Sequence, residues 1–499
     1  MRRKTIYTLV TGAMALCLAL MPARSAPVRD VADAEISSAI TGEILADNAI
    51  SANNVNVSTD DGIVLLTGTV NSILAKDRIQ ELTEATVGVR AVVNNVKVRP
   101  DTPRSDAELK KAVGNAWRND AAVESTGLTA SAENGTVTLT GAVDSFAEKQ
   151  LAETAARGVR GVKKIRNDIT IGFDKARPDR EIQAEISQRL INDIRIDDNL
   201  IEVHVTNGTA SLSGSVGSLQ EKNQAADDSW VAGVTSVNTA GLEIEWWARD
   251  DMRRTETGIA RSDAAIKKAV EDAFYYDPRV RSFNPDVKVL NGTVTLSGEV
   301  SNLQAKRAAE QDAKNTLGVW RVKNHLKVRP QGPPDDILEQ RVSAALKDNP
   351  YVARRSVTVD ADNGWIYLSG DVNTTYEKNQ AERVAEGIKG VVGVVNNIDF
   401  ESAWDSTPDW EIRENVKEQL RWSPFVDEEN ITVSVTNGVV TLSGTVDSWS
   451  GLIHAEENAL QGGAKNVIND LTADYRYYGP RGPGYYGSYI YQDSYYYPY

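Results

Sequence analysis

A short motif recurs six times along this chain, and its spacing sets the size of the folding unit. Each copy starts with Asn-Gly or Asp-Gly and continues as G-x-Φ-x-L-[ST]-G-x-V, where Φ is aliphatic in five copies and Ala in one. The copies run from Asp61 to Val70, Asn134 to Val143, Asn207 to Val216, Asn291 to Val300, Asn363 to Val372 and Asn437 to Val446. Successive first glycines lie 73, 73, 84, 72 and 74 residues apart. This period is longer than the roughly 20–50 residues of a solenoid repeat. We therefore expect six copies of one small, complete domain.

The Asn-Gly and Asp-Gly pairs predict tight β-hairpins. Both central residues of a type I′ turn need positive φ, which Asn, Asp and Gly tolerate. We interpret the first glycine of each motif as a turn residue, and the second as the mark of a bulge or of a close helix approach. These structural glycines are Gly62 and Gly68, Gly135 and Gly141, Gly208 and Gly214, Gly292 and Gly298, Gly364 and Gly370, and Gly438 and Gly444. A phosphate-binding loop is excluded because no Gly-Lys-Ser/Thr follows them.

Helical patterns lie on both sides of each hairpin. The clearest first helix begins with the capping box Ser105-x-x-Glu108 and continues with apolar residues at helical spacing. Second helices are expected to end at a glycine such as Gly88, before a last strand. Three of them should begin with capping boxes, at Ser145, Ser218 and Thr374. The predicted fold is α+β: six tandem αββαβ domains, each a three-stranded sheet covered by two helices on one face.

The repeat boundaries follow from these patterns. We expect the repeats at residues 31–100, 105–174, 179–246, 262–330, 335–402 and 409–474. Residues 247–261 lengthen one interval, so we interpret them as a linker that divides the array into two triplets. A unit of about 70 residues buries only about 60% of its unfolded surface, so contacts between neighbouring repeats should matter.

The two ends of the chain have other compositions. Residues 1–25 resemble a secretory signal, with three basic residues before an apolar run from Ile6 to Met21. Cys17, the single cysteine, lies inside it, so a mature chain would have no disulfide and no thiol chemistry. No transmembrane segment is expected in the mature chain. The tail, 475–499, holds eleven of the seventeen tyrosines and is expected to be disordered.

The charge balance restricts the class of partner. The formal net charge is −15, and removal of residues 1–25 would make it −19, with 51 basic and 70 acidic residues. Such a surface repels phosphate backbones, so nucleic acid is not an expected partner. Bulk electrostatics also oppose binding to anionic lipid, although a local basic patch would override them.

The repeats resemble a known family. The motif strand, together with the ending G-V-x-x-V-x-N-x-[VIL], is similar to the BON domain over residues 31–475. The third copy departs from the pattern at Ala210 and Thr239, and the sixth at Ala464. The resemblance implies an envelope protein without enzymatic activity, which contacts phospholipid surfaces or client proteins under osmotic or envelope stress.

Few residues point to a chemical site. The three histidines, His204, His325 and His454, fall in different repeats without metal-ligand spacing, so we expect no catalytic residue, metal or cofactor. The candidate lipid or partner contacts are Trp246, Trp247, Arg249, Arg253 and Arg254, because tryptophans beside arginines suit a lipid interface. The alternative is that these tryptophans pack between the third and fourth repeats.

Two functional hypotheses follow. In the first, the chain is exported to the periplasm and binds phospholipid headgroups through many weak contacts, which supports the envelope under osmotic stress. In the second, it is a periplasmic client-binding or chaperone-like protein for unfolded envelope proteins. Secretion, a membrane-peripheral location and the oligomeric state stay open.

Overall fold

The computed structural model describes six repeats and parts of the segments that join them. The described residues are 31–47, 50, 55–172, 177–245, 248, 261–319, 321–329, 332–353, 355–400, 407–423, 426–446 and 449–473. The expected signal peptide at 1–25, the expected tail at 475–499 and nearly all of the expected linker at 247–261 lie outside these residues.

Every repeat follows the order helix, strand, strand, helix, strand, and the second repeat shows it most plainly. Its first helix, α3 (Asp106–Asn119), precedes the hairpin of β5 (Thr129–Glu133) and β6 (Thr136–Val143). The second helix, α4 (Phe146–Arg157), leads to β7 (Lys164–Ile171). The central strand β6 is antiparallel to β5 and parallel to β7. The predicted α+β fold is confirmed.

The other repeats have the same elements, in places split or extended. Repeat 1 has α1 (Asp33–Ala46), β1 (Val55–Asp60), β2 (Ile63–Val70), α2 (Ile73–Glu84), β3 (Ala91–Asn94) and β4 (Lys97–Val98). Repeat 3 has α5 (Asp179–Asn192), η1 (Asp198–Leu200), β8 (Ile201–Thr206), β9 (Thr209–Val216), α6 (Leu219–Asp228) and β10 (Ser236–Ile244). Repeat 4 has α8 (Asp263–Tyr276), α9 (Pro278–Arg281), β11 (Asp286–Leu290), β12 (Thr293–Ser297), β13 (Glu299–Val300), α10 (Leu303–Lys314), β14 (Arg321–Asn324) and β15 (Lys327–Val328). Repeat 5 has α11 (Asp335–Asp348), β16 (Ser356–Asp362), β17 (Trp365–Val372), α12 (Thr375–Glu386) and β18 (Gly393–Phe400). Repeat 6 has α13 (Asp409–Trp422), η2 (Glu428–Asn430), β19 (Ile431–Thr436), β20 (Val439–Val446), α14 (Trp449–Gln461) and β21 (Asn466–Ala473).

The hairpin turns have the predicted backbone. In repeat 6, φ is 53° at Asn437 and 77° at Gly438, and Thr436 pairs with Val439 directly across the turn. In the other five repeats, φ of the first turn residue lies between 49° and 53°. Positive φ at both central residues is what a type I′ turn requires.

The second glycine of the motif has a different role from the predicted one in repeats 2, 3, 5 and 6. These closing glycines have φ between 120° and 137°. In repeat 5 the ladder runs through Gly370 without an extra residue, so there is no bulge at this position. A Cβ on Gly370 would lie 1.8 Å from the carbonyl oxygen of Ser356, at the start of the paired strand. The close approach is therefore by the neighbouring backbone and not by a helix.

A carboxylate fastens each hairpin turn to the start of the first helix, a contact that the sequence analysis missed. In repeat 5, Asp335 accepts the N–H of Asn363 at 2.8 Å and that of Gly364 at 2.9 Å. In repeat 2, the two backbone donors hold the pKa of Asp106 below its ordinary value. The same pair of bonds is made by Asp33, Asp106, Asp179, Asp263, Asp335 and Asp409.

A second recurring contact joins the last strand to the second helix. In repeat 2, Asn167 donates to the carbonyl of Lys149 at 3.3 Å and to Glu153 at 2.9 Å. Equivalent asparagines are Asn94, Asn324, Asn396 and Asn469. Repeat 3 has Thr239 at this position, and the register of β10 shifts between Asn238 and Gly241. The departure noted in the sequence therefore coincides with an irregular strand.

The second helices do not end at the predicted glycines. Helix α2 ends at Glu84, before Gly88, whose φ is 99°. A Cβ on Gly88 would lie 2.5 Å from Cδ1 of Ile36, so this glycine lets the loop pack on the first helix and does not end the second.

The capping boxes of the second helices are also different from the prediction. Ser145 accepts the N–H of Glu148 at 3.2 Å, but Glu148 accepts from Asp144, one residue earlier than the box requires. The same shift occurs in repeats 3 and 5, where Gly217 and Asn373 are the donors. The complete box predicted at Ser105 is present.

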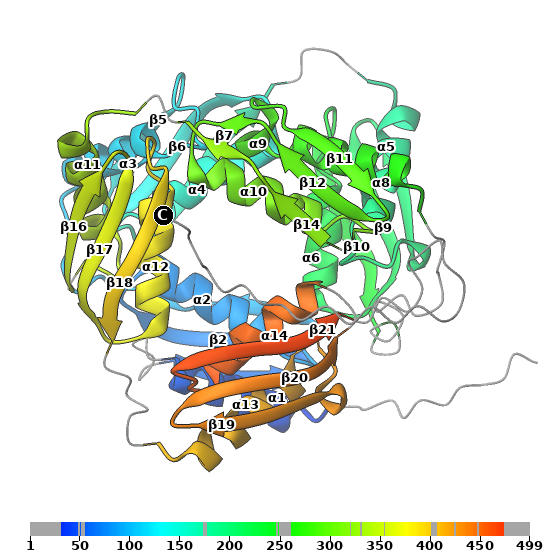
Figure 1. Cartoon of the computed structure of the whole chain (residues 1–499). Coiled ribbons are helices and arrows are strands. Elements are labelled where there is room, and N and C mark those ends of the chain that lie inside the picture. Colours follow the sequence, from blue (N-terminus) through cyan, green and yellow to red (C-terminus); the bar gives the residue numbers. More distant parts are fainter. Residues whose placement is uncertain are drawn as a thin grey trace, which may run out of the picture.

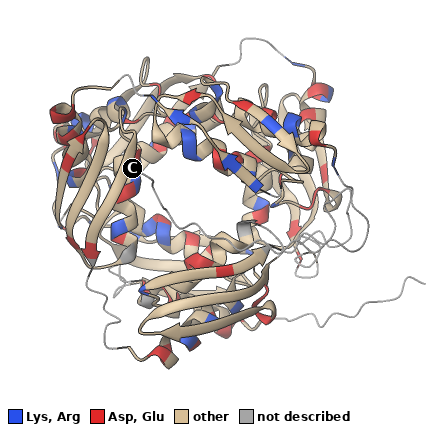
Figure 2. Cartoon of the chain, viewed as in Figure 1, with Lys and Arg blue, Asp and Glu red and all other residues tan. Residues whose placement is uncertain are grey.

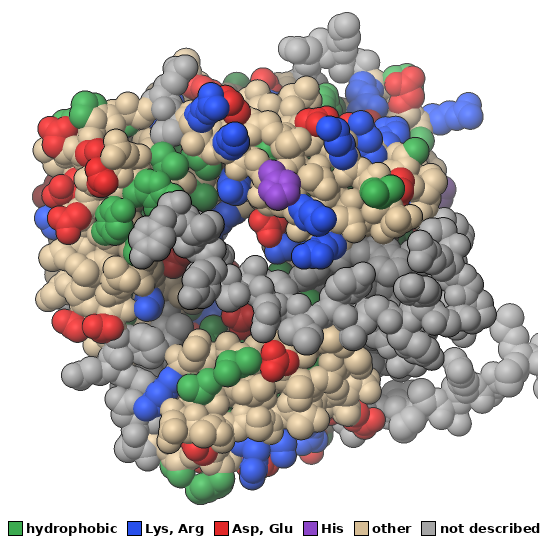
Figure 3. Space-filling model, viewed as in Figure 1, with side chains coloured by type: hydrophobic (Ala, Val, Ile, Leu, Met, Phe, Trp, Pro, Cys, Tyr) green, Lys and Arg blue, Asp and Glu red, His purple; other side chains and the backbone are tan. Residues whose placement is uncertain are grey.

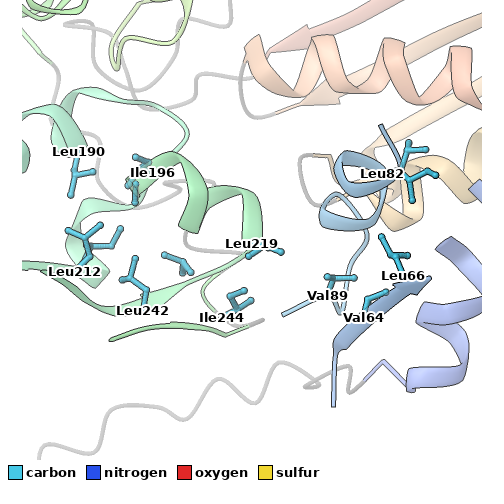
Figure 4. Close-up of a cluster of buried hydrophobic side chains, with 14 of the residues drawn as sticks. Val64, Leu66, Leu82, Val89, Leu190, Ile196, Leu212, Leu219, Leu242 and Ile244 are labelled. Carbon is cyan, nitrogen blue, oxygen red and sulfur yellow. The ribbon is translucent and has the colours of Figure 1, made fainter. Parts of the chain in front are cut away.

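The buried core of each repeat lies between its sheet and its helices. Leu190 on α5, Leu212 on β9 and Leu242 on β10 are buried together in repeat 3, and Val64 and Leu66 on β2 are buried in repeat 1 (Figure 4). The opposite face of each sheet carries no helix of its own repeat (Figure 1). That face is free to carry residues that differ between repeats.

The six repeats form two layers of three around a central opening (Figure 1). Repeats 4–6, green to red, form the front layer, and repeats 1–3, blue to green, lie behind them. The second helices face the opening, and the sheets lie on the outer side (Figure 1).

Contacts between all three repeats close the back layer. They involve the second helices or the residues that directly follow them. The contacts are Asp77–Arg157 at 2.7 Å, Asn223–Glu84 at 3.2 Å, and Phe146–Trp230 with ring centroids 4.1 Å apart.

A recurring backbone hydrogen bond joins the two layers. The residue before the glycine that follows a second helix donates its N–H to the carbonyl of the last residue of a first helix. The bonds are Val87→Trp422 at 3.1 Å, Lys389→Asn119 at 2.8 Å, Arg160→Asp348 at 2.7 Å and Leu317→Asn192 at 2.7 Å. Repeat 1 therefore pairs with repeat 6, repeat 2 with repeat 5 and repeat 3 with repeat 4.

Candidate functional site

The structure does not gather the predicted site residues into one place. Trp246, Trp247, Arg249, Arg253 and Arg254 lie outside the described residues, so their role stays a prediction. The first motif glycine of each repeat lies in the turn that precedes the central strand, and the second lies inside that strand or, in repeat 4, between β12 and β13. Their positions are those of structural residues and do not form a shared site.

The three histidines also lie apart. His204 is exposed on β8, His325 is exposed directly after β14, and His454 on α14 lies 3.3 Å from Glu457. Within the described ranges, no group of three or more His, Cys, Asp or Glu side chains could hold a metal ion.

Repeat 4 carries a row of basic side chains on the helix-free face of its sheet. Side chains along β14 and β15 alternate between the two faces. Leu326 is buried under the helices, and Asn324 donates to the carbonyl of Lys306 on α10 at 2.9 Å, so these two mark the covered face. The exposed positions on the other face are Arg321, Lys323, His325, Lys327 and Arg329. We call these five residues the basic stripe.

Neighbouring carboxylates neutralise little of the charge of the stripe. Arg329 forms an ion pair with Glu299 at 3.0 Å. In the part of the chain that the structure describes, no ion pair involves Arg321, Lys323 or Lys327. The space-filling view shows Lys and Arg side chains gathered around a histidine on this face of repeat 4 (Figure 3). The stripe is therefore a local positive surface on a chain whose net charge is −15.

The stripe is specific to repeat 4. Repeats 1 and 2 have two basic residues each at the corresponding positions, Lys97 with Arg99 and Lys164 with Arg166, and Arg166 is paired with Asp168. The positions on the same face of the last strand in repeat 6 are Asn466, Ile468, Asp470 and Thr472. The alternating sequence R-V-K-N-H-L-K-V-R was the signal from which the stripe could have been predicted.

Repeat 1 presents an apolar patch on the corresponding face of its sheet. Ile63, Leu65 and Val93 are 46%, 37% and 45% exposed, and Leu65 pairs with Val93 across β2 and β3. In repeats 2, 3 and 4, Thr or Ser occupies the positions of Ile63 and Leu65. The outer faces of the sheets have therefore diverged while the core pattern is shared.

The helices around the central opening carry residues of both charges (Figure 2). A cavity of about 810 Å³ lies there, mainly between repeats 1, 2, 5 and 6. Its charged lining includes Asp77, Glu81, Glu153, Glu457, Arg78, Lys149, Arg157 and Arg383. Burial raises the pKa of Asp77, and Arg157 opposes that shift. Because acids and bases are mixed along this wall, it favours no single charge class of ligand.

The comparison with protein families decides the identity of the repeats. The model of the BON domain matches residues 32–100, 105–172, 178–245, 262–330, 334–402 and 408–474. Each of these segments contains one αββαβ unit. The chain belongs to the BON domain family.

Two curated BON-domain relatives match part of the chain. Osmotically-inducible protein Y of Escherichia coli is 32% identical over 143 residues, which cover 28% of this chain and 71% of the relative. Outer membrane lipoprotein DolP of Haemophilus influenzae is 30% identical over 168 residues, which cover 32% of this chain and 86% of the relative. Each match has roughly the length of two BON repeats.

A solved structure also aligns with part of the chain. The C-terminal domain of CdsD, the structural protein of the type III secretion system of Chlamydia trachomatis, aligns over 43% of this chain and 100% of its own length. The identity is 15% and the TM-score is 0.12, so this likeness carries no argument.

No helix in the described BON repeats has the length and apolar composition to cross a bilayer.

Proposed function

We propose that this BON protein is a non-catalytic component of the cell envelope that binds phospholipid headgroup surfaces and supports the envelope under osmotic stress. The names of the relatives support the location and the stress, since one is osmotically inducible and the other is an outer membrane lipoprotein. The observation that carries the binding is the basic stripe of repeat 4. Phosphate headgroups are anionic, and each Lys or Arg near such a surface contributes about 1 kcal/mol of attraction.

The geometry of the stripe suits a flat, repetitive anionic surface. Its residues alternate along one edge of a sheet, so successive side chains on that face are about 7 Å apart. Among the described strands, β14 pairs only with β12 and β15 only with β13, so no described strand covers their outer side. A row of basic groups with this spacing can contact several headgroups at once.

The acidic residues outside the basic stripe favour one orientation of the protein on the membrane. Its repulsion from an anionic membrane is screened beyond about 10 Å at 0.1 M salt. At contact, the local charge of repeat 4 outweighs the distant acidic groups. The face of the ring that carries repeat 4 therefore turns toward the membrane.

Liposome sedimentation tests this proposal on the purified chain without residues 1–25. Binding is expected to vesicles that contain phosphatidylglycerol, to be weak on phosphatidylcholine alone, and to fall as salt is raised. The double variant Lys323→Gln, Lys327→Gln should bind roughly thirtyfold more weakly, because two contributions of about 1 kcal/mol are removed. The control, Lys164→Gln with Arg166→Gln at the positions of repeat 2 that correspond to Arg321 and Lys323, should bind like the unchanged chain. Equal losses in both variants would reject a site on repeat 4.

The tryptophans predicted from the sequence are tested in the same assay. If Trp246 and Trp247 contact lipid, their replacement by Ala weakens sedimentation with every vesicle composition. If they pack between repeats 3 and 4, the replacement lowers thermal stability and leaves sedimentation unchanged. Cell fractionation with an antibody tests the expected export to the periplasm.

The apolar patch of repeat 1 favours a second function, the binding of unfolded envelope proteins. Exposed aliphatic side chains on a sheet face are a common contact for other chains. In this case the protein suppresses aggregation of an unfolded outer membrane protein without sedimenting with liposomes. Ile63→Ser with Val93→Ser should then abolish the suppression, while Lys323→Gln with Lys327→Gln should not.

A further inference from the structure

Each repeat of the front layer presents an exposed apolar side chain on the helix-free face of its sheet. In repeats 4, 5 and 6 these side chains are Leu290, Tyr367 and Ile468. Their exposed fractions are 71%, 38% and 46%. The neighbouring strand positions, Val289, Leu368 and Val467, pack in the core of the same repeats. Since side chains alternate along a strand, the three exposed side chains point away from the core.

Repeat 5 adds a second aromatic ring to this face. Trp365 lies two positions before Tyr367 on β17, so both side chains are on the same face of the sheet. Trp365 pairs with Gly393, where a Cβ would lie 2.5 Å from Cζ3 of the indole, so the absent side chain leaves room for the ring. Repeats 2, 3 and 4 have Thr or Ser at the positions of the two aromatic residues. The shared fold therefore does not require aromatic side chains there.

The basic stripe lies on the same side of the ring as these apolar groups. The helix-free faces of repeats 4, 5 and 6 are visible together from one side (Figure 1). In that view, apolar side chains over the sheets of repeats 5 and 6 lie around the opening with the basic side chains of repeat 4 (Figure 3). Leu290 is close to the stripe, because Thr293 pairs with Leu290 on one side and with Arg321 on the other.

The back layer has a different distribution of apolar side chains. Its exposed apolar patch, Ile63, Leu65 and Val93, is confined to repeat 1. In the described parts of repeats 2 and 3, no large apolar side chain is exposed on a sheet face. Only the front layer can therefore touch a flat surface through apolar groups on three different sheets.

We propose that the ring lies flat on a phospholipid bilayer through its front layer, with Leu290, Tyr367 and Ile468 inserted at the level of the headgroups. This inference rests on the proposed binding of headgroups by the basic stripe, and it adds an apolar contact that charge does not supply. Attraction between basic residues and anionic lipid, together with burial of apolar side chains, is what holds proteins at such an interface.

The residue types and their placement favour a bilayer over a single bound chain. Trp and Tyr prefer the membrane interface, because the ring is buried while its polar atom stays in contact with water. The cationic row beside apolar groups is complementary to anionic headgroups above acyl chains. Three apolar contacts on three separate sheets match an extended, flat partner.

The apolar contact predicts binding that salt does not fully remove. Screening weakens the attraction of the stripe as ionic strength rises, but the burial of apolar surface is not screened. The variant Leu290→Ser, Tyr367→Ser, Ile468→Ser should bind vesicles of phosphatidylglycerol and phosphatidylcholine roughly tenfold more weakly and lose the binding that persists at high salt. The matched control removes the three apolar residues of the back layer, as Ile63→Ser, Leu65→Ser, Val93→Ser, and should bind like the unchanged chain.

An environment-sensitive fluorophore locates the contact on the chain without residues 1–25, which has no cysteine of its own. The fluorophore nitrobenzoxadiazole is attached to Leu290→Cys, Tyr367→Cys or Ile468→Cys, one site at a time. With the same vesicles, each probe should brighten, shift to shorter wavelength and be quenched by a nitroxide near the lipid headgroup. Probes at Leu65→Cys and at Thr138→Cys, which corresponds to Tyr367 in repeat 2, should not respond.

The outcomes separate this inference from the proposed function. If the chain sediments with the vesicles through Lys323 and Lys327 but the three front probes stay silent, the apolar contact is overturned and headgroup binding stands. If the chain does not sediment, both fall. A response at Leu65→Cys equal to that of the front probes overturns the flat placement on the front layer. Front probes that respond to an unfolded outer membrane protein and not to vesicles assign this face to client proteins and overturn the inference. Should the triple Ser variant fail to fold, the singly labelled chains decide.

Discussion

The amide of Leu317 in repeat 4 donates to the carbonyl oxygen of Asn192 in repeat 3 at 2.7 Å. The equivalent bond from Val87 reaches Trp422, which joins the first repeat to the last. Buried backbone groups need such partners, because an unpaired one costs about 1–3 kcal/mol. The contacts between layers therefore complete the hydrogen bonding of each repeat, and small BON domains gain stability from the assembly.

Closure of the back layer predicts a specific cross-link. Asn223 and Glu84 touch at 3.2 Å, although they come from repeats 3 and 1. Cysteines at these two positions should react with a short bismaleimide within one molecule and give a band of altered mobility on a denaturing gel. A chain with cysteines at 223 and 108 should give no such band, because Glu108 lies on the first helix of repeat 2. If the repeats formed an extended array without closure, neither pair of cysteines would give a band of altered mobility.

Removal of the carboxylate at the start of a first helix should lower the stability of that repeat. Asp335→Ala removes two hydrogen bonds to the turn of repeat 5 and a negative charge at a helix N-terminus. We expect a destabilisation of about 1–2 kcal/mol, measured by urea unfolding, with faster amide exchange at Asn363 and Gly364. The neighbouring variant Asp336→Ala keeps both bonds and should change stability by less than about 0.5 kcal/mol. Similar losses in the two variants would refute a role for the turn contact.

The closing glycines predict a steric effect that depends on position. Gly370→Ala places a Cβ against the carbonyl oxygen of Ser356 at a φ of 121°. Such a conformation is costly for any residue with a side chain, so we expect a loss of roughly 2 kcal/mol or more. Gly387→Ala, in the same repeat, has ordinary helical φ and no neighbour closer than 3.6 Å, so it should be tolerated. Calorimetric midpoints of both variants check the difference.

The raised pKa of Asp228 predicts that the stability of the folded chain falls as pH rises. Burial raises its pKa to about 7, Arg189 opposes the shift, and Asp193 adds to it. Below about pH 4 the carboxyl is protonated in both the folded and the unfolded chain. Between about pH 4 and pH 7 only the folded chain keeps the proton, so each rise in pH destabilises it, and the effect is complete above pH 7.

Asp228→Asn should reduce this slope, by an amount on the order of 1–3 kcal/mol across the window. Urea unfolding at pH 4.5, 6 and 7.5 measures it. The other charged and titratable groups around this site are unchanged in this variant: Glu185, Arg189, Asp193, Arg195, Asp227, Asp272, Tyr276, Asp277, Arg279 and Asp312. Asp272→Asn, at an aspartate paired with Lys268 near the surface, is the control and should leave the slope unchanged. An unaltered slope in Asp228→Asn would show that burial does not shift this carboxyl.

The repeat fold could be read from the sequence because local chemistry specifies it. Asn-Gly at each turn needs positive φ at both residues, and the structure has this at Asn437 and Gly438. The aspartate contact was readable too, because Asp335 precedes Asn363 by 28 residues and the interval is constant in all six repeats. It was missed because an aspartate at a helix start has an ordinary local explanation.

The ring could not be read from the sequence. Its layers meet through backbone groups such as the N–H of Val87, which leave no residue pattern. The basic stripe was visible as alternating Arg and Lys in repeat 4, but only the sheet shows that they share an open face. The tryptophans proposed as contacts lie outside the described residues, so their role still rests on composition.

Because the first repeat meets the last, every repeat of this ring has a counterpart in the opposite layer. A single added copy would have no counterpart in the opposite layer, and its terminal amide and carbonyl would lack their reciprocal acceptor and donor. Gain or loss in matched twos keeps every such bond. A ring of this kind can therefore lengthen or shorten only if the number of repeats stays even.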